Sequence, residues 1–451
     1  MRKKLLAFQV AIVFVVITTL VTSVSAATTP GSLTFSNTPL LRDDGDSEPA
    51  ISIASNGMMG ITGLSWQLFN TNLWTGAFGS TPTFRGVVDA GLQKTGKRVF
   101  GGGDADVDIG STGTLHATTL IFLVNPAFRA FQLGVSAIAC PNGDSPSFDI
   151  NACSKKIIDT AGADRQWITS DGPHVWISYH DSKNSSIIRV QRSDDDGYTW
   201  KKVGDPIVGQ DGITANSTFN NIQGPIVADP FTHNVYDIYA AGETGILKGR
   251  TFTPNHIYVS RSTDGGKSWT ASLVYQIAPG SSFANVFPAL AVDPANGKLY
   301  AAFSDGQRLF FSSSSDQGAT WSPAVTVNVT PANTAIFPWV AAYNGTVDVV
   351  YYGTTATSKD DPSAVWNTYL AQTTNDGASF TQNQVSNTPN HMGEICTEGT
   401  GCAPGTRNLL DLFEVSIDPQ NGKAAVIYTD DTLTTDGSGN PLPQIVLAQQ
   451  N

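Results

Sequence analysis

Carboxylates and arginines recur together just before short apolar segments of this sequence. Asp164 and Arg165 precede one such segment, and Arg407 and Asp411 precede another. Carboxyl groups that crowd one another are harder to ionise, and a general acid at neutral pH must keep its proton. Arginine binds anionic groups at two points, and aromatic rings stack on the apolar faces of sugars. These residue types together indicate a site for a polar ligand such as a glycan.

The candidate residues form two groups according to the chemistry they could supply. The candidates for catalysis are Asp104, Asp164, Arg165, Glu243, Arg308, Arg407 and Asp411. The candidates for ligand binding are Trp66, Trp167, His180, Tyr352 and Asp430. The alternative interpretation is that these groups cap strands and form ion pairs between neighbouring segments.

A repeated unit must position these groups. Each unit is predicted to be an apolar strand, a tight turn and a second strand rich in aromatics, and residues 287–300 are a clear copy. The units recur about every 61 residues and together fill residues 27–451, which predicts one domain. The predicted turn positions are Gly57, Gly113, Gly172, His233, Gly297, Gly345 and Gly422.

A second motif, S/T-x-D-x-G-x-x-W/F, falls at the same place within three units, and residues 373–380 are a degenerate fourth copy. Its Asp can accept backbone N–H bonds, and its Gly can adopt positive φ, as a turn between two strands requires. The three complete copies consist of Ser193, Asp195, Gly197 and Trp200; Ser262, Asp264, Gly266 and Trp269; and Ser314, Asp316, Gly318 and Trp321.

This motif resembles the Asp-box, or BNR, repeat of the sialidase superfamily of β-propellers. The resemblance implies an all-β fold of four-stranded antiparallel blades, with Asp boxes as structural turns far from the ligand site. Glycine turns and Asp boxes would share one face, and the candidate residues would lie on the opposite face, here called the top face. We expect seven blades, because the sequence contains seven units. Six blades are the alternative, because six is the number implied by the resemblance to sialidases. The strand near residues 32–39 should complete the last blade and close the ring.

Sialidases of this superfamily bind substrate with three arginines and carry an early Phe/Tyr-Arg-Ile-Pro motif. Phe84-Arg85-Gly86-Val87 is the nearest match here and lacks Ile-Pro, so no catalytic residue is carried over from the family. Three functions remain open: an exo-acting glycoside hydrolase related to sialidases, a non-catalytic propeller that binds a glycan or an extracellular protein, and a surface scaffold.

The composition favours a turn-rich all-β protein, because charged residues make up only 14% of the chain and it contains 43 Gly and 24 Pro.

The first residues predict that the chain is exported from the cytoplasm. Residues 1–26 have the basic start, apolar run and small-residue end of a cleaved export signal; an uncleaved anchor is the alternative. Loss of three basic residues with it would change the net charge from −12 to −15, which disfavours nucleic acid. No membrane partner is expected after cleavage.

Four cysteines in an exported chain suggest two disulfides, and sequence proximity favours Cys140–Cys153 and Cys396–Cys402. The first may replace an Asp box in the second unit. No metal or other cofactor is expected. Asp104, Asp106 and Asp108 would share one face of a strand, where they could hold a structural cation or simply begin a solvated strand. The cluster Asp43, Asp44, Asp46 and Glu48 is open to the same two interpretations.

Overall fold

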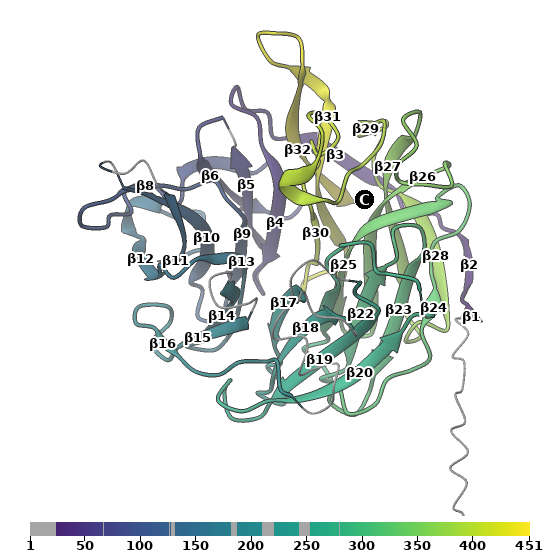
Figure 1. Ribbon diagram of the computed structural model, residues 1–451, viewed down its shortest axis with the longest axis horizontal. Coiled ribbons are helices and arrows are strands. Elements are labelled where there is room, and N and C mark those ends of the chain that lie inside the picture. Colours follow the sequence, from purple (N-terminus) through teal and green to yellow (C-terminus); the bar gives the residue numbers. More distant parts are fainter. Residues whose placement is uncertain are drawn as a thin grey trace, which may run out of the picture.

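Seven sheets arranged in a ring make up the computed structural model, which describes residues 24–65, 67–125, 127, 131–181, 187–209, 221–242, 253–278 and 280–451. The first strands of the blades surround the middle of the view in Figure 1, and the later strands lie toward the outside. The seven-bladed prediction is therefore confirmed. No helix among these residues is long and apolar enough to cross a membrane.

The blades follow one another along the chain, and each contains four antiparallel strands from the axis outward. Blade 1 contains β4 (Ser47–Ile53), β5 (Met58–Ser65), β6 (Asn70–Ala77) and β7 (Thr83–Val87). Blade 2 contains β9 (Ala105–Ile109), β10 (Leu115–Val124), β11 (Phe131–Cys140) and β12 (Ser154–Asp159), with β8 (Arg98–Phe100) paired to the far end of β10. Blade 3 contains β13 (Ala163–Asp171), β14 (His174–Asp181), β15 (Ile187–Ser193) and β16 (Lys201–Lys202).

The remaining blades repeat this pattern. Blade 4 contains β17 (Ile222–Ala228), β18 (Val235–Ala241), β19 (His256–Ser262) and β20 (Thr270–Gln276). Blade 5 contains β21 (Ala289–Val292), β22 (Leu299–Ser304), β23 (Leu309–Ser314) and β24 (Val325–Thr326). Blade 6 contains β25 (Thr334–Tyr343), β26 (Thr346–Thr354), β27 (Val365–Thr373) and β28 (Ser379–Gln384), with β29 (His391–Met392) paired to β27. Blade 7 contains β30 (Glu414–Ile417), β31 (Ala424–Thr435), β32 (Pro441–Gln450) and β3 (Phe35–Pro39).

The turn between the first two strands of every blade has the predicted backbone conformation. All seven predicted positions have positive φ, from 57° at Gly172 to 84° at Gly345. Six of them are glycines, for which this conformation costs little, and the seventh is His233 with φ 60°. The repeat read from the sequence thus corresponds to the blades.

The Asp boxes join the third and fourth strands of blades 3 to 6, and their polar groups are bonded within the turn. In blade 4 the Ser262 hydroxyl accepts the Gly266 N–H at 2.7 Å and donates to Asp264 Oδ1 at 2.9 Å. Asp264 Oδ1 also accepts the Ser268 N–H at 2.9 Å. In blade 2, the Cys140–Cys153 disulfide joins the end of β11 to the start of β12, the place where a box would lie. These features hold the outer strands of the blades.

The N-terminal segment closes the ring. Strand β3 pairs with β32 from Phe35 opposite Gln450 to Pro39 opposite Val446, so the last blade combines an N-terminal strand with the C-terminal strand. Before it, β1 (Val24–Ser25) and β2 (Ala27–Pro30) add in parallel to the outer strands of blades 5 and 6 (Figure 1). The predicted closure is confirmed, and it leaves no unpaired edge between the first and last blades.

Phe35→Ala should lower the free energy of unfolding by about 3 kcal/mol, because it removes a buried ring from the closing strand. Denaturant unfolding measures this. Ser36→Ala, on the exposed side of the same strand, is the control and should change stability by less than about 0.5 kcal/mol. Equal stability of the two variants would show that the strand does not close the ring.

Asp264→Ala should cost about 1–2 kcal/mol of stability, since the Ser262 hydroxyl and two backbone N–H groups of the turn lose their acceptor. The neighbouring Lys267→Ala, whose exposed side chain bonds nothing in the turn, serves as the control. A matching loss of thermal stability in both variants would argue against the Asp box as a structural turn.

Candidate functional site

Bulges at the start of the innermost strands direct side chains toward the axis. The pairing of β4 with β5 shifts between Ser47 and Ala50, and that of β13 with β14 shifts at Arg165. At these bulges Glu48 and Arg165 both have φ 49°, a conformation that side chains other than glycine rarely adopt. A bulge re-aims the side chain of its extra residue. As a result Glu48 and Arg165 meet although they come from blades 1 and 3.

The two residues belong to an ion network of Glu48, Asp104, Arg165, Arg407 and Asp411, here called the axial network. Arg165 Nη1 lies 2.5 Å from Glu48 Oε1 and 3.6 Å from Asp104 Oδ1, and its Nη2 lies 3.0 Å from Asp411 Oδ2. Arg407 Nε donates to Asp411 Oδ1 at 3.1 Å. The network therefore joins residues of blades 1, 2 and 3 to the segment that leads into blade 7.

Burial controls the charge of this network. It raises the pKa of Glu48 to about 8 and that of Asp104 to about 6, although Arg165 lowers both. The ring of Phe287 lies 4.3 Å from the Arg165 guanidinium and covers it from the side of blade 5. Two guanidinium groups thus face three carboxyl groups in a poorly solvated place, and the network retains a proton near neutral pH.

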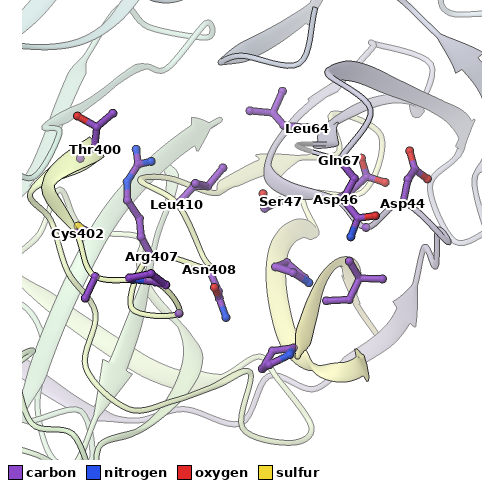
Figure 2. A pocket seen from close by; sticks show the side chains of 18 residues that line it. Asp44, Asp46, Ser47, Leu64, Gln67, Thr400, Cys402, Arg407, Asn408 and Leu410 are labelled. Atoms are coloured by element: carbon purple, nitrogen blue, oxygen red, sulfur yellow. The ribbon is translucent and has the colours of Figure 1, made fainter. Parts of the chain in front are cut away.

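A cavity of about 550 Å³ adjoins the network on the top face (Figure 2). Figure 2 shows Arg407, Thr400 and Cys402 on one side and Asp44, Asp46 and Gln67 on the other. This size suits a small ligand. The lining residues named in the figure are Asp44, Asp46, Ser47, Leu64, Gln67, Thr400, Cys402, Arg407, Asn408 and Leu410.

The two aspartates of the cavity have different environments. Asp46 is almost fully buried, accepts both of its hydrogen bonds from Asn72 Nδ2 at 2.9 and 3.2 Å, and has its pKa raised to about 8 by burial. Asp44 Oδ1 forms an ion pair with Arg42 Nε at 3.2 Å. Asp44 Oδ2 has no hydrogen-bond partner among the described residues. Burial therefore opposes ionisation of Asp46, whereas Asp44 lies beside a cation and has one buried oxygen without a hydrogen-bond partner among the described residues.

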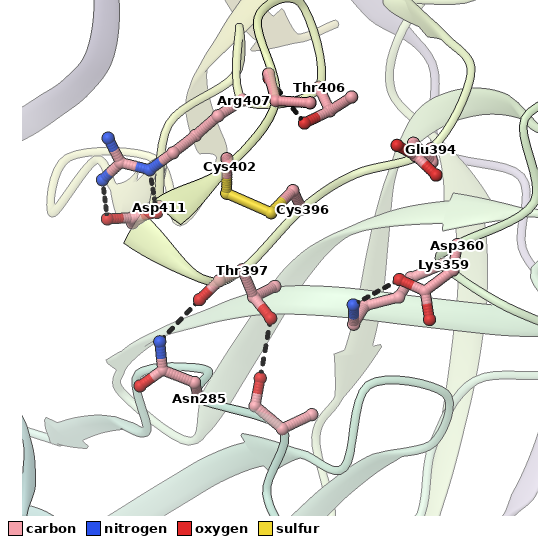
Figure 3. The surroundings of a disulfide bond; sticks show 12 residues. Asn285, Lys359, Asp360, Glu394, Cys396, Thr397, Cys402, Thr406, Arg407 and Asp411 are labelled. Carbon is pink, nitrogen blue, oxygen red and sulfur yellow. Dashed lines mark hydrogen bonds and ion pairs between the residues drawn. A yellow bond between two sulfur atoms is a disulfide. The ribbon is translucent and has the colours of Figure 1, made fainter. Parts of the chain in front are cut away.

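A disulfide loop forms the wall opposite these aspartates. Cys396 and Cys402 are bonded and enclose η2 (Gly399–Gly401), and Cys402 itself lines the cavity (Figure 3). Thr397 fixes the loop to the segment before blade 5, because its carbonyl accepts from Asn285 Nδ2 at 2.5 Å and its hydroxyl donates to the Ala284 carbonyl at 2.9 Å. Thr397 thus ties the wall to the segment that leads into blade 5.

The structure brings four of the seven candidates for catalysis into the axial network, namely Asp104, Arg165, Arg407 and Asp411. Asp164 lies beside it and accepts the Arg165 N–H at 3.1 Å. Arg308 does not join them: its Nη2 pairs with Asp305 Oδ2 at 2.7 Å in the turn between β22 and β23. Glu243 lies outside the described residues, as do Trp66 and residues 1–23 of the predicted leader.

The candidates for ligand binding lie deeper than the sequence suggests. Trp167 is 1% exposed and packs 5.3 Å from Trp339, measured between ring centroids. Tyr352 is fully buried, stacks on Phe413 at 4.1 Å and accepts the Thr429 N–H at 3.0 Å. These two rings support the site as part of the core and are covered by protein.

The other two are polar groups already bonded to protein. His180 contacts the Asn221 side chain, and burial lowers the pKa of its imidazole to about 4. Asp430 accepts the Thr432 N–H at 2.8 Å, and burial raises the pKa of its carboxyl to about 6. Asp106, which lies further inside, is likewise bonded to protein, because its carboxyl group accepts the N–H groups of Val107 and Ile168. No group of three metal-ligating side chains is close enough to hold a metal ion among the described residues.

Sequence reasoning missed Gln67 and Asn408, and it left Asp44 and Asp46 undecided between two structural roles. The sequence did contain a signal for the bulges that direct side chains toward the axis. In blades 1, 4, 5 and 6, a residue followed by proline stands where the innermost strand starts. These pairs are Glu48-Pro49, Gly224-Pro225, Phe287-Pro288 and Phe337-Pro338. Proline cannot donate to a strand pairing, so it marks a bulge or an irregular strand start.

Comparisons with known proteins agree with this architecture. The BNR repeat-like domain family matches residues 171–361, a stretch that contains all three complete Asp boxes. Residues 171–361 are thus similar to the BNR repeat-like domain, and the described chain as a whole is a seven-bladed β-propeller. No curated protein matches its sequence.

Among solved structures, this propeller resembles a polysaccharide lyase, an ulvan lyase bound to a glucuronate-rhamnose sulfate fragment. The two are 12% identical with a TM-score of 0.53, over 91% of this chain and 95% of the other. An α-L-arabinofuranosidase of Fusarium graminearum is 15% identical with a TM-score of 0.47, over 71% and 92% of the two chains. Trypanosoma rangeli sialidase is 15% identical with a TM-score of 0.46, over 90% and 55%. At these identities the likeness concerns the fold.

The structure also shows where the partial match to the sialidase motif lies. Phe84 and Arg85 are on β7, the outermost strand of blade 1, and Arg85 Nε donates to Thr75 Oγ1 at 2.7 Å. A residue on an outer strand is far from the axis of a propeller. Arg85 therefore cannot join Arg165 and Arg407 in a three-arginine site.

The stability of the propeller should fall as pH rises from 5 to 8, in part because of Asp46. Its folded pKa of about 8 exceeds its unfolded value of 3.8, so the folded state holds a proton that the unfolded state releases over this range. Asp46→Asn should remove this contribution. Its stability relative to the unchanged protein should increase from pH 5 to pH 8 in denaturant titrations. A pH-independent difference between the two proteins would contradict the raised pKa.

Proposed function

We propose that this propeller is an exported glycan-active protein, and specifically a glycoside hydrolase that takes the end of a glycan chain into the top-face cavity. The observation that carries the proposal is the pair Asp44 and Asp46 on one wall of that cavity. Glycoside hydrolases generally use a pair of carboxyl groups, one protonated and one ionised, close to the bond they cleave. Environments that separate the pKa values of two neighbouring carboxyl groups are the usual way to assign these roles.

In this proposal Asp46 is the general acid. It keeps its proton near pH 7 because of burial, and a general acid must carry a proton at the working pH. Asp44, paired with Arg42 and with Oδ2 free of partners among the described residues, is the base or nucleophile. The proton of Asp46 goes to the glycosidic oxygen as that bond breaks, and water supplies the hydroxyl of the new reducing end. The remaining proton of that water passes to Asp44 if Asp44 is the base, or back to Asp46 if Asp44 is the nucleophile.

The opposite wall binds the sugar. The Arg407 guanidinium is held by Asp411 and faces the cavity, and the amide groups of Asn408 and Gln67 can bond hydroxyls. Leu64 and Leu410 offer apolar surface for the face of a sugar ring. The disulfide loop limits the cavity on one side, which favours a chain end over the middle of a chain.

Export is supported by independent features. Both disulfides are formed, and disulfides persist in oxidising compartments outside the cytoplasm. The leader-like residues 1–26 precede β2, which begins at Ala27, and cleavage after Ala26 would remove only the two-residue strand β1 from the described fold. We propose that the working protein is residues 27–451.

Turnover of a panel of chromogenic glycosides, sialosides included, by residues 27–451 tests the hydrolase. Asp46→Asn should lower kcat by about 10²–10⁴-fold and leave binding largely intact, because only proton donation is removed. Arg407→Ala should mainly raise KM, since it removes a contact to the bound sugar.

Arg308→Ala is the matched control, because Arg308 is paired locally with Asp305, and it should retain full activity. Glycan binding without turnover across the panel would identify a binding propeller in place of a hydrolase. Full activity of Asp46→Asn would show that another group is the acid.

A further inference from the structure

Four aromatic rings form a continuous row on the part of the top face that blades 1 and 2 share. Phe69 lies 6.5 Å from Phe100 and 5.8 Å from Phe122, and Phe122 lies 6.3 Å from Phe131, all between ring centroids. These four residues are here called the aromatic row. They come from three strands of blade 2 and from the loop between β5 and β6 of blade 1.

The aromatic row is exposed to solvent. Phe131 is 68% exposed, Phe69 44% and Phe100 41%, and Leu68 beside them is 56% exposed. Single exposed apolar residues are common on proteins, whereas contiguous exposed apolar groups mark binding surfaces. The row is therefore a candidate surface for a ligand or partner.

The backbone around Phe69 is strained in a way that keeps its ring at the surface. Phe69 has φ 52°, a conformation that bulky residues rarely adopt. The link from β8 to β9 presses against it, and a side chain at Gly102 would come within 2.5 Å of the Phe69 carbonyl carbon. Strain of this kind persists at functional sites, where something other than stability maintains it.

A cationic loop adjoins the row. Lys94, Lys97 and Arg98, here called the basic loop, lie in a stretch with no acidic residue between Asp89 and Asp104, in a chain of net charge −12. Lys94 and Lys97 face each other across a tight turn, in which the Lys97 N–H donates to the Lys94 carbonyl at 3.0 Å. Like charges placed opposite one another are destabilising unless an anion compensates them.

Strand pairing places Arg98 of the basic loop and the aromatic row on one face of the sheet. Arg98 and Phe100 alternate along β8 and so share a side, and Phe100 lies opposite Phe122 on β10. The row also continues from the cavity, because Gln67 lines the cavity and Leu68 and Phe69 follow it directly in the chain. A chain leaving the cavity past Gln67 would cross the row next.

We propose that the aromatic row and the basic loop bind an acidic polysaccharide, whose sugar rings stack on the phenylalanines and whose acid groups pair with Lys94, Lys97 and Arg98. The chain end would occupy the cavity, so in this respect the inference rests on the proposed function. An anionic lipid surface offers similar chemistry. The continuity of the row with the cavity favours the polysaccharide.

Binding of polygalacturonate and dextran sulfate to residues 27–451, measured by calorimetry at low and high salt, tests the proposal. Phe131→Ser and the double variant Lys94→Ala/Arg98→Ala should each weaken binding of at least one polymer by about tenfold or more. The double variant should also reduce the salt dependence, because it removes the ion pairs. Phe69→Gly should weaken binding and raise the melting temperature, since glycine relieves the strain.

Two controls match these changes. Phe231→Ser removes a ring that is 60% exposed in the turn between β17 and β18, on the opposite face, and Lys423→Ala removes a cation from the corresponding turn of blade 7. Both should leave binding within about twofold of the unchanged protein. Arg407→Ala should leave polymer binding to the row largely intact even if glycoside turnover is lost, so failure of the cavity and failure of the row are distinguishable.

Unchanged polymer binding in the row and loop variants would overturn the inference, as would the absence of binding of both polymers to the unchanged protein. Sedimentation with phosphatidylserine vesicles tests the alternative that the surface binds an anionic lipid membrane. If the row variants lose vesicle binding while polymer binding is unaffected, the surface belongs to a lipid membrane and the polysaccharide proposal is wrong.

Discussion

The buried guanidinium of Arg165 is the interaction on which the top face depends. A buried cation is stable only when carboxylates and hydrogen bonds surround it, and here the carboxyl groups of Glu48, Asp104 and Asp411 do so. These three come from parts of the chain far apart in sequence. Their attraction to one cation therefore fixes blades 1, 2 and 3 relative to the segment before blade 7. Asp411 in turn orients Arg407, which places a second guanidinium at the cavity wall.

The two faces of the ring differ in the groups they carry: one face carries the structural turns, and the top face carries the candidate site. On one face, glycine turns and Asp boxes bond their polar groups within the turn, as Ser262 and Asp264 do, or to the turn of a neighbouring blade, as Asp376 does to Lys298. On the top face, longer connections carry polar groups whose partners lie in other blades. Asp46 and Glu48 hold protons there for the same physical reason, since burial opposes ionisation more strongly than their neighbours favour it. The cavity combines such a proton donor with a cation and amide groups.

The fold could be predicted from the sequence because its signals are local. The conformation of a glycine turn or of an Asp box depends on only a few neighbouring residues, so it can be predicted from a short stretch of sequence. The spacing of these turns then predicts the number and bounds of the blades. Closure by residues 32–39 followed from the same pattern. The sequence also placed Arg165, Asp104, Arg407 and Asp411 at the ends of the innermost strands, and the structure joins them by ion pairs.

The site was less predictable because its properties depend on depth. Trp167 and Tyr352 were expected to meet a ligand, but the sequence gives no measure of how far a ring lies below the surface. Arg308 was expected among the other arginines, although a near neighbour, Asp305, pairs with it first. Asp44 and Asp46 have the same side chain two residues apart. Only packing distinguishes them, because it buries Asp46 against Asn72, which raises the pKa of Asp46, and places Asp44 beside Arg42.

A crystal structure of residues 27–451 with a bound oligosaccharide tests the central claim most directly. The account predicts a terminal sugar in the top-face cavity, with hydroxyl or ring oxygens within hydrogen-bond distance of Arg407 and with its glycosidic oxygen beside Asp46. A sugar bound on the face of the Asp boxes, or a top-face cavity that stays empty of sugar while the ligand binds elsewhere, would contradict it.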